Sequence, residues 1–147
     1  MSNADPMDIL ICHDRWANEQ VLHACAGLTR DQFHKRFEMG PGSLHDTVSH
    51  ILGAQARWTD VLVGRESVTR LEETERTVAE LVEVHRKVAA EFAEQARAKP
   101  LTDTVTAVRK GQTWHFTRGA VVTHVTTHGM HHRAQCLNML RHVGVTE

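Results

Sequence analysis

Residues 118–142 read RGAVVTHVTTHGMHHRAQCLNMLRH, a stretch without proline or acidic residues. Its apolar residues recur at helical spacing, so that Val121, Val125, Met139 and Leu140 share one side of a helix. The pattern predicts an amphipathic helix over the whole stretch. Five of the chain's twelve histidines lie between residues 115 and 132, and this is therefore the region in which to look for a functional site.

Three further helices are predicted upstream. Asp5 and Pro6 form a typical helix start, with an N-cap side chain followed by proline at the first helical position. They open a helix over residues 6–26. Ser43 to Asp46 resembles a capping box and opens a helix over residues 44–63, which Gly64 closes. The inward positions of the first helix are expected to be Leu10, Ala17, Val21 and Ala24.

The third of these helices is predicted over residues 70–98. A second capping-box pattern, Thr69 to Glu72, opens it, and it ends before Pro100. Residues 102–108 and 112–117 are rich in Thr, Val and aromatic residues and flank Lys110-Gly111, which predicts a small β-hairpin. The apolar stripe of the third helix consists of Val78, Leu81, Val82, Val88, Phe92 and Ala96.

Four amphipathic helices of this length pack most economically as a four-helix bundle. We therefore predict an all-α protein with a short β-hairpin-like insert between the third and fourth helices. A chain of about 150 residues buries enough surface to sustain one core. The whole sequence, residues 1–147, is accordingly predicted to form a single four-helix-bundle domain.

Composition and charge exclude several classes of function. With 17 Lys and Arg against 18 Asp and Glu, the net charge of −1 leaves no basic surface for nucleic acid. No apolar run approaches the roughly 18 residues that a membrane span needs, and the chain start does not resemble a secretory leader, so a cytoplasmic protein without membrane contact is expected. Cys12, Cys25 and Cys136 are too few and too widely spaced for a disulfide framework, and we expect buried thiols in a reducing compartment.

Histidine is the unusual feature of the composition, because twelve histidines outnumber the nine glycines. In the 118–142 helix, His128 and His132 are four residues apart and lie within or beside the apolar stripe, so they point inward. His124, His131 and His142 are rotated roughly 60° to 100° from that stripe, toward the polar flank.

Two inward imidazoles four residues apart can bind one metal ion from one side. The alternative is a pair of buried, hydrogen-bonded core histidines. The metal interpretation accounts better for two stacked imidazoles in an apolar interior, because each needs a partner and both cannot be protonated without repulsion. Cys136, one turn beyond His132, could also reach a metal, but a core thiol is the better interpretation.

A third ligand is expected from the 44–63 helix. His50 lies on the apolar stripe of that helix, whereas His45 is nearer the helix start and is a weaker candidate, better placed for exposure. Three histidine ligands with an open fourth position are typical of a catalytic or substrate-binding metal rather than a structural one. Imidazole ligands admit zinc, nickel, iron or copper.

The run from His124 to Gln135, together with the ending from Leu140 to Gly144, resembles the last-helix signature of the DinB/YfiT-like superfamily. The run from His50 to Trp58 resembles the second helix of that family, and Arg15-Trp16-Ala17-Asn18 resembles its first. Together these segments follow the order and spacing of the family over nearly the whole chain.

The resemblance implies a four-helix bundle with a divalent metal, most often nickel or zinc, held by His50, His128 and His132. It also implies a homodimer. Some relatives are metal-dependent transferases or isomerases that use a low-molecular-weight thiol such as mycothiol, bacillithiol or glutathione, and many have no established reaction. Two positions depart from the family pattern: Ala134 replaces the usual Gly, and Gln55 replaces a frequent acidic residue, so that a supporting carboxylate is absent or comes from elsewhere.

Five more residues are candidates for the surroundings of the metal or for a substrate pocket. Gln135 is placed to hydrogen-bond a ligand histidine or a bound water, with an interior amide as the alternative. His124 and His131 are candidate proton shuttles, although surface histidine is the default. Trp58 and Trp16 either line a substrate pocket or serve as packing on inward helix faces. Arg133 is expected to be solvated on the helix flank unless it attracts an anionic substrate.

Two functions follow from these features. The first is a metal-dependent enzyme, a thiol transferase or a maleylpyruvate-isomerase-like protein, that acts on a small-molecule substrate. No protein nucleophile is needed, which suits a chain without a G-x-S-x-G elbow or a phosphate-binding glycine loop. The second is a non-enzymatic metal-binding stress-response module in which the metal stabilises a dimerising bundle.

Overall fold

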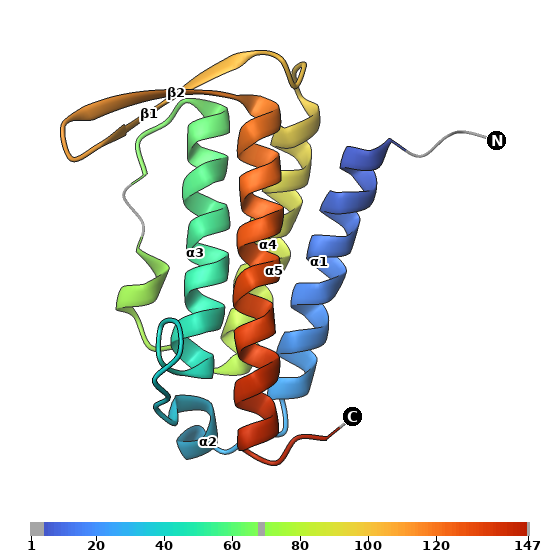
Figure 1. Ribbon diagram of the computed structural model, residues 1–147, viewed down its shortest axis with the longest axis vertical. Helices are drawn as coiled ribbons and strands as arrows, with labels where there is room; N and C mark the ends of the chain where they lie inside the picture. The colour runs from blue at the N-terminus through green and yellow to red at the C-terminus, as the bar shows by residue number, and fades with distance from the viewer. Residues whose placement is uncertain (1–4, 68–69, 147) are drawn as a thin grey trace.

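The computed structural model describes residues 5–67 and 70–146. In these ranges the chain is mostly helical and carries one small antiparallel sheet of two strands (Figure 1). No helix in the described part combines the length and the apolar character needed to cross a membrane. The elements in chain order are α1 (Pro6–Cys25), α2 (Arg30–His34), α3 (Leu44–Val63), the 3-10 helix η1 (Leu71–Glu73), α4 (Val78–Arg97), β1 (Thr104–Arg109), β2 (Gln112–Thr117) and α5 (Arg118–His142).

Four long helices lie side by side (Figure 1). Helix α5 contacts α1 and α3, and α4 contacts the same two helices from the other side. Helices α1 and α5 run in one direction, and α3 and α4 run in the opposite one (Figure 1). Because α3 and α4 are parallel neighbours, the segment between them must return along α3, a helix of 20 residues and about 30 Å. This return brings η1 into contact with α3.

The predicted starts and ends of three helices are confirmed. Helix α1 begins after Asp5, whose side chain accepts a hydrogen bond from the backbone of Met7. Helix α3 begins after Ser43, whose hydroxyl accepts from the backbone of Asp46, and it ends at Gly64. Helix α5 spans the whole predicted stretch. The caps satisfy backbone N–H groups that have no partner within a helix.

The predicted helix over residues 70–98 starts too early. Helix α4 begins only at Val78, because Thr77 and Glu80 form a reciprocal capping box. Thr69, the first residue of the capping box that the sequence suggested, lies outside the described residues. The carboxylate of Glu72 binds side chains on α3 instead of capping a helix.

The short helix α2 was not predicted. It begins at a capping box between Thr29 and Gln32, in which both reciprocal hydrogen bonds are present. The pattern is visible in the sequence, but α2 has only five residues and no apolar periodicity to support it.

The predicted hairpin is confirmed. Strands β1 and β2 pair in antiparallel register from Thr104 opposite Thr117 to Arg109 opposite Gln112, and Lys110-Gly111 forms the turn. Phe116 faces the helices and makes an edge-to-face contact with Trp58, with ring centroids 5.5 Å apart. The hairpin is thereby anchored to α3, while its tip projects beyond that helix (Figure 1).

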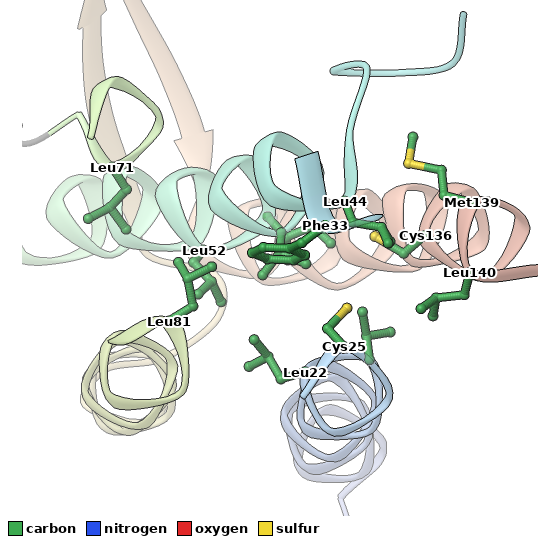
Figure 2. Close-up of a cluster of buried hydrophobic side chains, with 13 residues drawn as sticks. Leu22, Cys25, Phe33, Leu44, Leu52, Leu71, Leu81, Cys136, Met139 and Leu140 are labelled. Atoms are coloured by element: carbon green, nitrogen blue, oxygen red, sulfur yellow. The ribbon is translucent and has the colours of Figure 1, made fainter. Parts of the chain in front are cut away.

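The apolar core consists of two clusters. The larger lies toward α2, which contributes Phe33, and toward the ends of α1 and α5; Figure 2 shows Cys25, Leu44, Leu81 and Cys136 among its side chains. The smaller lies toward the hairpin and includes Ile11, Leu62, Phe92, Ala96, Val121, Val122 and Val125. Some expectations about exposure are wrong: Cys12 is exposed, and Leu10 and Val82, both assigned to apolar stripes, are 47% and 42% exposed.

A layer of buried polar side chains separates these clusters. Arg133 is 7% exposed, contrary to the expected solvated position, and its Nη1 donates to Asp14 at 2.6 Å and to Asn18 at 2.9 Å. Gln55 Nε2 donates to the other oxygen of Asp14 at 3.3 Å. Gly129 leaves space for this group, since a Cβ there would lie 2.6 Å from Asp14 Oδ1. Helices α1, α3 and α5 are thus joined by one buried ion pair and its hydrogen bonds.

Candidate metal centre

Three half-buried histidines from two helices converge at the level of this polar layer. His50 lies on α3, and His128 and His132 lie one turn apart on α5. One nitrogen of each ring lies within 4.8 Å of one nitrogen of each of the others. The ring centroids of the three pairs are 4.5 to 4.9 Å apart. The three side chains that were predicted to face inward therefore lie close together, and they could hold a metal ion.

The distances suit a metal bound through imidazole nitrogens. His50 Nε2 and His128 Nε2 are 3.1 Å apart. Two nitrogens bound to one tetrahedral zinc at about 2.05 Å would be about 3.3 Å apart. Two lone pairs that face each other at this separation repel, so the pair needs a proton or a cation between its nitrogens. The donor set is compatible with a divalent metal.

The outer nitrogens of two rings have hydrogen-bond acceptors. His132 Nδ1 donates to Gln135 Oε1 at 2.7 Å, so the expected contact between Gln135 and a candidate ligand is present. His50 Nδ1 lies 3.3 Å from Glu72 Oε1, and an ionised carboxylate can only accept. In both rings the Nδ1–H tautomer leaves Nε2 with a lone pair, which is the form that a metal requires.

Burial favours the neutral form of His128 and His132. Desolvation is the largest cause that lowers the pKa of His128, to about 4, and the neighbouring His132 and His50 lower it further. Desolvation also lowers the pKa of His132, although the hydrogen bond to Gln135 opposes this effect. At neutral pH these imidazoles are unprotonated, so a metal would displace no proton from them.

The metal-free protein should lose stability as the pH falls from about 6.5 to about 4. An unfolded histidine takes up a proton near pH 6.5, whereas folded His128 does so only near pH 4, so the unfolded state binds more protons in this window. For a half-exposed group we expect a contribution of roughly 1 to 2 kcal/mol after solvent screening. Urea unfolding in the presence of a chelator, compared with His128→Gln, measures it; equal pH dependence in both proteins would contradict the prediction.

Aromatic rings lie next to the cluster on the hairpin side. His124, one turn before His128, has its ring centroid 5.6 Å from that of His128 and 5.0 Å from that of Trp58. Trp58 is partly buried and contacts Phe116 of β2. Trp58 therefore combines packing against the hairpin with proximity to the cluster. On the other side, His131 is exposed and contacts His132, with ring centroids 4.9 Å apart.

The structure does not place two of the candidate side chains as expected. Trp16 is 55% exposed on α1 and contacts the ring of His13, so the expectation that it faces inward is wrong. His45 is only 4% exposed, contrary to its predicted exposure. It does not belong to the cluster of three histidines. Its Nδ1 bonds Asp46, and its Nε2 accepts a hydrogen bond from the backbone of Arg76. These two contacts satisfy its ring.

Sequence reasoning missed Glu72 and Arg57. The expected carboxylate was missing at Gln55, which binds Asp14 in the polar layer. The structure supplies Glu72 from the segment that returns along α3, with Arg57 bound to its carboxylate at 2.7 and 2.9 Å. No local pattern signalled this contact, because Glu72 resembled the last residue of a capping box.

Comparisons with known proteins identify the family. The family model described as the DinB family matches residues 1–147. The search of curated proteins gave no match. Because the family match spans the entire sequence, the chain belongs to the DinB family.

Proposed function

We propose that this protein binds a divalent metal, nickel or zinc, through His50, His128 and His132. The observation that carries the proposal is the convergence of three imidazoles, two of which have outer nitrogens bound to acceptors. Three imidazole ligands leave a coordination position for a substrate. Imidazole is a good ligand for both metals. The arrangement of the four long helices supports the four-helix-bundle architecture of the family.

We further propose a metal-dependent thiol transferase or isomerase activity. A divalent metal at such a site lowers the pKa of a bound thiol or polarises a substrate oxygen. Of the cysteines, Cys25 and Cys136 are buried, and burial raises the pKa of Cys25 to about 12 and that of Cys136 further still. Neither is suited to act as a nucleophile. A low-molecular-weight thiol is the natural source of sulfur, and Trp58 and His124 form an aromatic wall for the second substrate.

A homodimer in the cytoplasm is part of the proposal. Large apolar side chains are exposed on the adjacent helices α1 and α5: Leu10 and Trp16 on α1, and Met130 and Leu137 on α5. A second copy that covered these side chains would remove their apolar surface from water. Neither the net charge of −1 nor the helices of the described residues favours nucleic acid or membrane as a partner.

The alternative is a non-enzymatic metal-binding module. The histidine cluster joins α3 to α5, so a metal that binds only the folded state would stabilise this contact. The same geometry therefore supports a structural role in a stress-response protein.

Metal-loaded protein should turn over a thiol with an electrophile. The assay combines a panel of thiols with a halogenated aromatic or maleylpyruvate. We expect the activity to fall at least about a hundredfold in His50→Ala, His128→Ala and His132→Ala, because each would remove a metal ligand. Cys12→Ser should retain activity, since its exposed thiol lies on α1. A metal-loaded protein without turnover, whose variants lose only thermal stability, would favour the module.

A further inference from the structure

Glu72 lies half-buried beside His50, and its carboxylate contacts several residues of α3. Its carboxylate accepts a hydrogen bond from Arg57 Nη1 at 2.9 Å and forms an ion pair with Nη2 at 2.7 Å; Arg57 lies seven residues after His50 on the same helix. Paired with the Arg57 guanidinium, the carboxylate offers acceptor oxygens, one of which can accept the proton of His50 Nδ1.

Gly53 provides the space for this carboxylate. A Cβ at position 53 would lie 2.7 Å from Glu72 Oε2 and 2.9 Å from both Glu72 Cδ and Oε1. Gly53 sits within α3, where glycine costs roughly 1 kcal/mol relative to alanine. The helix thus carries a residue of poor helix propensity at the point where Glu72 approaches it.

From this geometry we propose that Glu72 is a positioning residue for the metal centre, seated by Gly53 and Arg57, and that it directs His50 Nε2 toward the metal. The inference rests on the proposed metal site. It also identifies the source of the carboxylate that Gln55 does not supply. A carboxylate that accepts the outer N–H of a metal-binding imidazole holds the ring orientation and raises its basicity.

The topology explains why the carboxylate comes from this segment. Helices α3 and α4 run in the same direction (Figure 1), so the chain must come back to the start of α3 before α4 begins, and η1 lies on this return. This passage brings η1 against α3 beside His50. The ion pair with Arg57 then joins the returning segment to the helix that carries the candidate ligand.

Gly53→Ala tests the proposal without removing any polar group. The added methyl must displace the carboxylate of Glu72, the flexible end of its side chain, while alanine favours the helix. We expect nickel or zinc affinity, measured by competition with a chelator, to fall roughly ten- to a hundredfold in Gly53→Ala and in Glu72→Ala. The double variant should be no weaker than either single variant, because both changes remove the same contact.

Two controls separate positioning from a structural role. Glu73→Ala removes the same charge from η1 at an exposed residue and should leave metal affinity unchanged. In metal-free protein, nitrogen-15 spectra should show His50 as the Nδ1–H tautomer in the wild type and as a mixture of tautomers in Gly53→Ala. A purely structural ion pair would alter thermal stability without altering the tautomer.

The outcomes distinguish this inference from the proposed function. If the wild type binds metal and both variants bind it within twofold of the wild type, Glu72 does not position His50 and the inference is overturned. If the wild type binds neither metal, the proposed function fails. The tautomer measurement then decides separately whether Glu72 orients His50, with a mixture in the wild type overturning that orientation.

Discussion

Replacing His128 with alanine is expected to lower nickel or zinc affinity by at least about a thousandfold, equivalent to roughly 4 kcal/mol. The ring of His128 is in contact with both other histidines, with ring centroids 4.9 Å from His50 and 4.5 Å from His132. Its removal leaves one of the three clustered histidines on each helix, His50 on α3 and His132 on α5. A metal held by two ligands from two helices loses the chelation that three supply.

Metal content and affinity of protein purified without a metal-affinity column provide the measurement. His124→Ala is the matched control, because it removes an imidazole one turn away on the same helix whose ring contacts Trp58. We expect this control to retain the wild-type affinity. Equal metal content in His128→Ala and the wild type would eliminate the proposed site.

Replacing Arg133 with alanine is expected to lower the free energy of unfolding by about 3 to 5 kcal/mol. The change leaves the carboxyl group of Asp14, which is 2% exposed, without its cation. Burial already raises the pKa of Asp14 in the wild type, although the hydrogen bond and the charge of Arg133 oppose this effect. Without Arg133, the buried ionised carboxylate is strongly disfavoured.

The pH dependence of the stability of Arg133→Ala shows whether the unpaired carboxylate of Asp14 causes the loss. The folded-state pKa of Asp14 in Arg133→Ala should lie above the unfolded value of about 3.9. The unfolded state then loses its proton first, so the stability deficit should grow as pH rises from about 4 through the folded-state pKa. Urea unfolding at several pH values measures this trend, with Arg141→Ala as the exposed control.

A double variant, Asp14→Leu with Arg133→Met, should recover much of the lost stability, because apolar side chains replace both members of the buried pair. A deficit in Arg133→Ala that is independent of pH would point to lost packing instead of an unpaired charge.

Local signals predicted much of the fold. Helix α5 follows from its apolar period, and α1 and α3 follow from caps whose hydrogen bonds involve residues at most three apart. The hairpin follows from two β-rich segments around Lys110-Gly111. The predicted start of α4 was wrong because the sequence contains two capping-box patterns eight residues apart. The glutamate of the first pattern, Glu72, contacts α3 instead of capping a helix, and the local sequence does not reveal this contact.

For the candidate site, helix geometry predicted the three histidines but not the residues that contact them. The i, i+4 spacing of His128 and His132 and the helical phase of His50 were sufficient to select three of twelve histidines, because helix geometry alone sets which side chains share a face. The partners of these groups were decided by tertiary structure. Glu72 meets His50 because parallel neighbouring helices require a returning segment, and Arg133 is buried because Asp14 and Asn18 of α1 offer it acceptors. Contacts between residues 22 and 119 positions apart depend on how helices pack, which no local pattern encodes.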